Sequence, residues 1–77
     1  MPRTGSPATR HVAAVERAAA VLDALAEGEE LGTNEVARRT GLNPSTASRQ
    51  LATLVALGLV SHVEETGRYR LGPRLVE

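Results

Sequence analysis

The sequence contains no cysteine, tryptophan, phenylalanine or lysine, and Tyr69 is its one aromatic residue. Without cysteine, the chain can form neither a disulfide framework nor a thiolate metal site. Without large aromatics, any core must be built from Leu, Val and Ala. No apolar run approaches the roughly 18 residues that span a bilayer, and the N-terminus lacks the apolar segment of a secretory signal. These absences predict a soluble cytoplasmic protein with no membrane partner.

Residues for catalysis or cofactor binding are also missing. His11 and His62 stand alone, without a third ligand at metal spacing. No serine lies in a Gly-x-Ser-x-Gly elbow, and no glycine-rich loop precedes a helix as a phosphate cradle. We therefore expect no enzyme activity, no metal ion and no cofactor. The 77 residues are enough for one small domain only.

The charged residues are unevenly distributed. Nine arginines balance nine acidic residues, so the formal net charge is zero. Residues 31–77 nevertheless hold six arginines and four acids, and no acid lies between Val36 and Val63. Arginine makes forked contacts with phosphate and guanine, although a bias toward Arg and Ala codons explains the missing lysine equally well. Because local charge matters more than the sum, this acid-free stretch is the candidate nucleic-acid surface.

The clearest element is a helix predicted over residues 43–57. Asn43 is a good N-cap, because its side-chain oxygen can accept an unpaired N–H group of the first turn. Pro44 suits the first helical position, and Gly58 suits the left-handed residue after the C-terminus. At about 100° per residue, one narrow stripe contains Ala47, Leu51, Leu54 and Gly58, with Val55 at its edge. The opposite side carries Ser45 and Arg49, flanked by Thr46 and Ser48, which suits a helix laid into a groove.

An amphipathic helix is also predicted over residues 12–27, after a tail of residues 1–11 that we expect to be flexible. Its apolar positions repeat at steps of three and four, and the expected inner face is Val15, Ala18, Ala19, Leu22, Leu25 and Ala26. Gly28 ends the helix, and the acidic turn Glu29-Glu30 should point away from any phosphate.

A shorter helix is expected from Thr33, as its capping residue, to about Thr40. It should expose Arg38 and Arg39, which are candidate phosphate contacts, although paired surface arginines are common without any partner. Gly41 supplies the stop before the helix at 43–57. Two helices joined by a short turn containing glycine form the helix-turn-helix layout.

Residues 59–71 read as a β-hairpin, because a β-branched run, a turn at 65–67 and an alternating segment follow one another. Alternation places Tyr69 and Leu71 inward and Arg68 and Arg70 outward. We expect Glu64 and Glu65 to oppose these arginines, so that cross-strand pairing competes with DNA contact. A hairpin after a helix-turn-helix is a wing, here the hairpin of residues 64–70.

Residues 15–75 together resemble the N-terminal DNA-binding domain of IclR-type bacterial transcriptional regulators. The stretches that carry the resemblance are VERA (15–18), EVARRTGL (35–42), STASRQLATL (45–54), LGLV (57–60) and TGRYRLGP (66–73). Their order and spacing over some four-fifths of the chain make the resemblance specific. It implies that the helix from Asn43 enters the major groove, with Ser45, Thr46 and Arg49 facing DNA and the wing around Gly67 and Arg68 along the backbone.

The resemblance also implies partners beyond DNA. IclR-type regulators act as dimers or tetramers, so two copies would read two half-sites one or more helical turns apart. The family carries a C-terminal domain that binds a small organic effector, reached through a linker helix beginning near Arg74. Such an effector is expected only if a C-terminal domain exists.

The predicted fold is therefore mainly α with a small β-hairpin: a winged helix-turn-helix over residues 12–73, followed at 74–77 by the start of a linker helix. The predicted function is sequence-specific binding of double-stranded DNA. The alternative is a winged-helix protein-interaction module that does not bind DNA. The candidate DNA-binding residues are Thr33, Arg38, Arg39, Asn43, Ser45, Thr46, Ser48, Arg49, Gln50, Thr53, Arg68 and Arg70.

Overall fold

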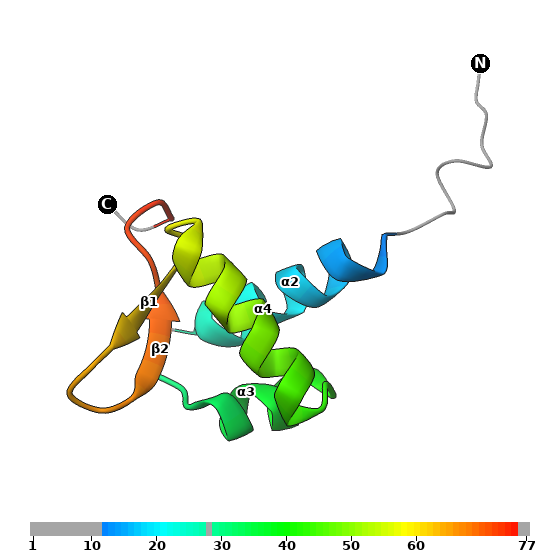
Figure 1. Ribbon diagram of the computed structural model, residues 1–77, viewed down its shortest axis with the longest axis horizontal. Coiled ribbons are helices and arrows are strands. Elements are labelled where there is room, and N and C mark those ends of the chain that lie inside the picture. The colour runs from blue at the N-terminus through cyan, green and yellow to red at the C-terminus, as the bar shows by residue number, and fades with distance from the viewer. Residues whose placement is uncertain (1–11, 28, 76–77) are drawn as a thin grey trace, which may run out of the picture.

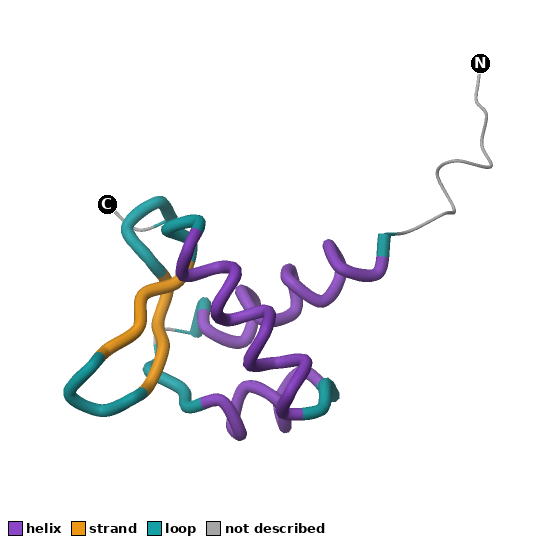
Figure 2. Tube along the Cα trace, in the orientation of Figure 1, coloured by secondary structure: helices purple, strands orange, loops and turns teal. Residues whose placement is uncertain are grey.

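The computed structural model describes residues 12–27 and 29–75. In chain order its elements are the helices α2 (Ala13–Leu25), α3 (Thr33–Thr40) and α4 (Pro44–Ala56) and the strands β1 (Val60–Val63) and β2 (Arg68–Leu71). The hairpin lies beside the helices, and α4 crosses in front of α2 in the view of Figure 1. Figure 2 shows the same order of helices followed by one hairpin. The predicted fold class is confirmed, whereas the predicted tail at 1–11 lies outside the described residues.

The ends of α4 are those that the sequence predicted. The Oδ1 atom of Asn43 accepts a hydrogen bond of 2.8 Å from the backbone N–H of Thr46. Pro44 is the first helical residue, and Leu57 is the C-cap. Gly58 follows with a φ of 78°, the left-handed conformation that closes many helices.

The start of α3 differs from the prediction, because Thr33 is its first helical residue and not its cap. The N-cap is Gly32, whose backbone is extended, and no side chain caps this end. The reason is that the preceding residue, Leu31, is paired with the hairpin. The chain leaves this bridge extended through Gly32 and turns into the helix one residue before the expected position.

The core is aliphatic and is shared by the helices, Leu31 and β1. Its buried members are Val21, Leu25, Leu31, Val36, Ala37, Ala47, Leu51, Leu54 and Val60. The predicted inner stripe of α4 is therefore confirmed. All three buried positions of α4 come from that stripe.

The predicted inner face of α2 was partly wrong. Val21 is fully buried although it was not on the predicted face. Val15, which was on that face, is 64% exposed, and Ala19 and Ala26 are also exposed. So many positions of this helix are alanine or valine that periodicity alone could not choose between neighbouring stripes. The N-terminal half of α2 also extends away from the other elements (Figure 1), so its apolar side chains have no core to enter.

The wing is an antiparallel hairpin in which Val60 pairs with Leu71 and Val63 with Arg68. It is joined to the α2–α3 connection by two backbone hydrogen bonds between Leu31 and Tyr69, of 2.9 and 2.8 Å. Tyr69 and Leu71 are half-buried, and the two arginines of β2 point outward, as predicted.

The expected cross-strand pairing in the wing is not found. Glu64 and Glu65 lie in the turn rather than on β1, and neither forms an ion pair with an arginine of the described residues. Arg70 instead lies 3.9 Å from a carboxylate oxygen of Glu30, which comes from the α2–α3 connection. Gly67 has the predicted positive φ, at 73°.

The segment after the wing forms a turn at residues 73–75, and the rest of the predicted linker-helix start, residues 76–77, lies outside the described part of the chain. No helix among the described residues is long and apolar enough to cross a membrane.

Candidate nucleic-acid interface

The outer face of α4 is polar and open to solvent. Ser45, Ser48, Arg49 and Thr53 are exposed along it, opposite the buried stripe of the same helix. Within the described residues, the side chain of Arg49 has no hydrogen bond or ion pair. Its guanidinium therefore keeps five N–H donors for an acceptor outside the chain.

The first turn of α4 combines capping with exposure. The Oδ1 atom of Asn43 accepts from the backbone of Thr46 and also from the hydroxyl of Ser45, at 3.0 Å. This double acceptance fixes the Asn43 side chain at the helix end. The positive end of the helix dipole and the remaining first-turn donors favour an anion at this position.

The two arginines of α3 have different surroundings. The side chain of Arg38 is 71% exposed and pairs with Glu35. The side chain of Arg39 is 34% exposed and reaches three carboxylates: Glu27 at 3.0 Å, Glu29 at 3.0 Å and Glu35 at 2.8 Å. The hydrogen bond from Arg39, followed by the charge of Arg38, holds the pKa of Glu35 below its ordinary value despite partial desolvation. The same hydrogen bond with Glu35 raises the pKa of Arg39.

The wing brings Arg68 close to the start of α3. Thr33, Asn34 and Arg68 line one hollow of about 490 Å³, together with acidic residues of the α2–α3 connection. Arg68 is exposed, and its side chain makes no ion pair within the part of the chain that the structure describes. Arg68 is therefore the wing cation that is available to an external anion, while Arg70 is shared with Glu30.

The remaining predicted residues lie on α4. Ser48 and Thr53 are exposed on its outer side, and Gln50 and Thr46 are half-buried at its edges. Two residues beside these positions were not among the predicted ones: Asn34, which is exposed in the second position of α3, and Glu30, which accepts from Thr66 at 3.4 Å and links the α2–α3 connection to the wing. Nothing in the sequence placed residue 30 beside residue 66.

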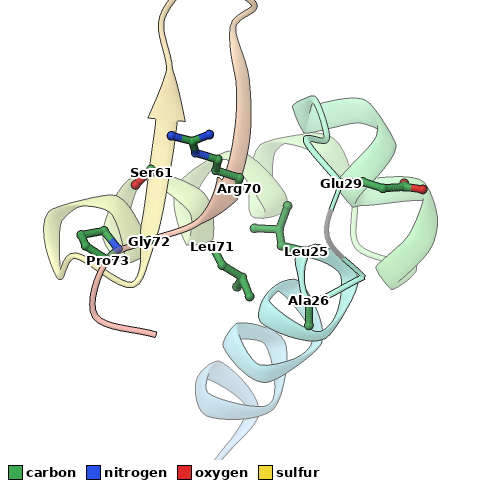
Figure 3. A pocket seen from close by; sticks show the side chains of 8 residues that line it. All are labelled: Leu25, Ala26, Glu29, Ser61, Arg70, Leu71, Gly72 and Pro73. Atoms are coloured by element: carbon green, nitrogen blue, oxygen red, sulfur yellow. The ribbon is translucent and has the colours of Figure 1, made fainter. Parts of the chain in front are cut away.

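Another hollow lies away from the outer face of α4. It has a volume of about 610 Å³ between the end of α2 and the C-terminal part of β2 (Figure 3). Leu25, Ala26 and Leu71 provide its apolar lining, and Arg70 and Glu29 are its charged members. No group of three or more histidine, aspartate or glutamate side chains that could hold a metal ion occurs among the described residues.

Helices α2, α3 and α4, followed by a hairpin that packs beside them, define a winged helix-turn-helix domain. A model of the IclR helix-turn-helix domain matches residues 14–64. The chain belongs to this family.

Relatives with known names agree with this assignment. Over 68 residues the chain is 43% identical to the glycerol operon regulatory protein of Streptomyces coelicolor, covering 87% of this chain and 27% of that protein. It is 39% identical to the HTH-type transcriptional regulator XynR of Escherichia coli, covering 86% of this chain and 27% of that protein. The crystal structure of an IclR transcriptional regulator from Alicyclobacillus acidocaldarius superposes with a TM-score of 0.81 at 36% identity, over 87% of this chain and 28% of that one. The chain thus spans about a quarter of the length of these relatives.

Proposed function

We propose that this domain binds double-stranded DNA in a sequence-specific manner as part of a bacterial transcriptional regulator, with α4 in the major groove. The observation that carries this proposal is the exposed Arg49, which has no partner in the described chain and lies on the polar outer face of a helix that packs against α3. An α-helix fits the major groove of B-DNA, and an arginine there pairs with the O6 and N7 atoms of guanine. The membership of the family and the names of the relatives support the same function.

The proposed contacts fall into two groups. Contacts with base edges, the groove floor or the adjoining backbone come from the recognition helix, with Arg49 in the centre and shorter polar side chains around it: Asn43, Ser45, Thr46, Ser48, Gln50 and Thr53. Contacts with phosphate come from Arg38, from Thr33 at the start of α3, and from Arg68 and Arg70 on the wing. Phosphate contacts position the domain, and base contacts provide the specificity.

We also propose that the complete regulator works as a dimer or higher oligomer in the cytoplasm, in association with the nucleoid. The N-terminal half of α2 supports this, because Val12 and Val15 are 62% and 64% exposed on a helix end that extends from the domain. A second copy is a suitable cover for such side chains. An effector would bind a further domain of the complete protein, and we propose no catalytic activity for the present domain.

The test is fluorescence anisotropy with mixed duplex DNA at two salt concentrations. The wild-type domain should bind, and its affinity should fall steeply with salt. The variant Arg49→Gln should weaken binding by about tenfold or more, whereas the matched control Arg17→Gln, on α2, should have a much smaller effect. Absent or salt-insensitive binding would instead support a winged helix that docks a protein, a role compatible with zero net charge and an acidic wing turn.

A further inference from the structure

The guanidinium group of Arg39 is enclosed by carboxylates from two segments of the chain. Its Nε bonds to Glu35 on the same helix, and its Nη1 and Nη2 bond to Glu27 and Glu29 of the α2–α3 connection. Each of its three nitrogens thus has a different acidic partner. These bonds connect α3 to Glu29 and Glu27, which lie 10 and 12 positions before Arg39 in the sequence.

The surroundings of Arg39 do not suit a DNA phosphate. The three carboxylates bonded to Arg39 outnumber the two guanidinium groups of Arg38 and Arg39, which leaves an excess of one negative charge. The hollows on either side of Arg39 add two acids, Asp23 and Glu30, and one arginine, Arg68, so negative charge remains in excess. A phosphate that approached Arg39 would have to displace these partners and would meet like charge around them.

The segment that Arg39 holds is the one that carries the wing. Two residues after Glu29, Leu31 exchanges two backbone hydrogen bonds with Tyr69 of β2. Glu30, which lies between Glu29 and Leu31 in the sequence, accepts a hydrogen bond from the hydroxyl of Thr66 and lies near Arg70. A continuous set of contacts therefore runs from α3 through Arg39 and the α2–α3 connection to the wing.

We infer that Arg39 is a positioning residue: it holds the α2–α3 connection against α3 and so sets the wing relative to α4, without contacting DNA itself. This role revises the phosphate contact expected for Arg39 from the sequence, and its relevance to DNA binding rests on the proposed function. A paired surface arginine usually contributes little. Here three pairs converge on one guanidinium, and what they restrain is a short connection that is anchored to the wing.

The experiment compares Arg39→Gln with the matched control Arg38→Gln, and with the variant Glu27→Gln/Glu29→Gln, which keeps the arginine but removes its two partners in the connection. The first measurement, without DNA, is hydrogen exchange by NMR at the amides of Leu31 and Tyr69, with the α4 amide of Leu51 as an internal reference. Both Arg39→Gln and the double variant should accelerate exchange at Leu31 and Tyr69 relative to Leu51, by roughly three- to tenfold. Arg38→Gln should leave the exchange rates of Leu31 and Tyr69, each divided by that of Leu51, unchanged.

The second measurement is the salt dependence of DNA affinity. A lost phosphate contact lowers the slope of log K against log salt by about one, and Arg38→Gln should do so. Arg39→Gln should weaken binding by about two- to tenfold at every salt concentration with an unchanged slope. Unchanged exchange at Leu31 and Tyr69, or a slope lowered by about one in Arg39→Gln, would overturn the inference. A wild-type domain that binds no DNA would refute the proposed function alone, because the exchange measurement needs no DNA.

Discussion

Gly72 lies directly against the backbone of Gly58, so that a Cβ atom at position 72 would stand 2.6 Å from the carbonyl oxygen of Gly58. The N–H of Gly72 donates to Leu59 at 2.9 Å, and the Nη1 atom of Arg74 donates to the carbonyl of Leu57 at 3.2 Å. The segment that leaves the wing is thus fastened to the C-terminal end of α4.

This contact predicts that Gly72→Ala destabilises the fold. The added methyl would meet backbone atoms, which cannot move aside as a flexible side chain can, and we expect a loss of about 2 kcal/mol or more in the free energy of unfolding. Gly32→Ala is the matched control, because nothing lies within 4 Å of its Cβ position. As Gly32 is an N-cap, that control should lose less than about 1 kcal/mol. Urea denaturation followed by circular dichroism measures both, and equal stabilities of the two variants would contradict the prediction.

A second prediction concerns the cap of α4. Asn43→Ala removes the acceptor for the N–H of Thr46 and should cost about 1 kcal/mol of unfolding free energy. Asn43→Asp keeps the acceptor and adds a negative charge at the positive helix end, so the fold should retain its stability. The same charge would repel phosphate, so DNA affinity should fall in Asn43→Asp although the fold does not. If the aspartate variant bound DNA as well as the wild type, this helix end would not lie near the DNA backbone.

The end signals of α4 explain why this helix was the most predictable part of the fold. Asn43, Pro44 and Gly58 each act through local backbone conformation, which depends on neighbouring residues only. The stripe of α2 was less predictable, because an alanine-rich helix offers several apolar faces and the choice depends on what packs against it. Val21 is buried by elements that come later in the chain.

Of the candidate site, the exposed residues of α4 were predictable, whereas the pairing of the arginines was not. Arg38 and Arg39 are neighbours with the same chemistry, and the sequence could not distinguish them. Their difference arises from Glu27 and Glu29, which reach only Arg39 because of the path of the α2–α3 connection. Ion pairs between segments so far apart in sequence depend on tertiary structure.

A third prediction concerns acid pH. The pKa of Glu35 is lowered in the folded state, from a usual value of 4.5. A carboxyl with a lowered folded pKa stabilises the fold above its unfolded pKa, and this stabilisation is lost as the pH falls through the folded value. The wild type should therefore lose stability below pH 4.5 more steeply than Glu35→Gln, in which the group cannot titrate. Thermal unfolding at a series of pH values measures this, and parallel pH profiles for the two proteins would contradict it.

The last prediction separates the two outward arginines of the wing. Arg68 has no ion-pair partner among the residues described, whereas Arg70 lies 3.9 Å from Glu30. If both reach phosphate, Arg68→Gln should lower the slope of log K against log salt by about one. Arg70→Gln should lower the slope by less, because Arg70 must give up its contact with Glu30 before it can bind a phosphate. Each variant also removes one positive charge from the same strand, so a general effect of net charge would change both slopes equally. Anisotropy titrations at four or more salt concentrations distinguish these cases, and equal slopes for the two variants would show that the wing does not present Arg68 to the DNA backbone in preference to Arg70.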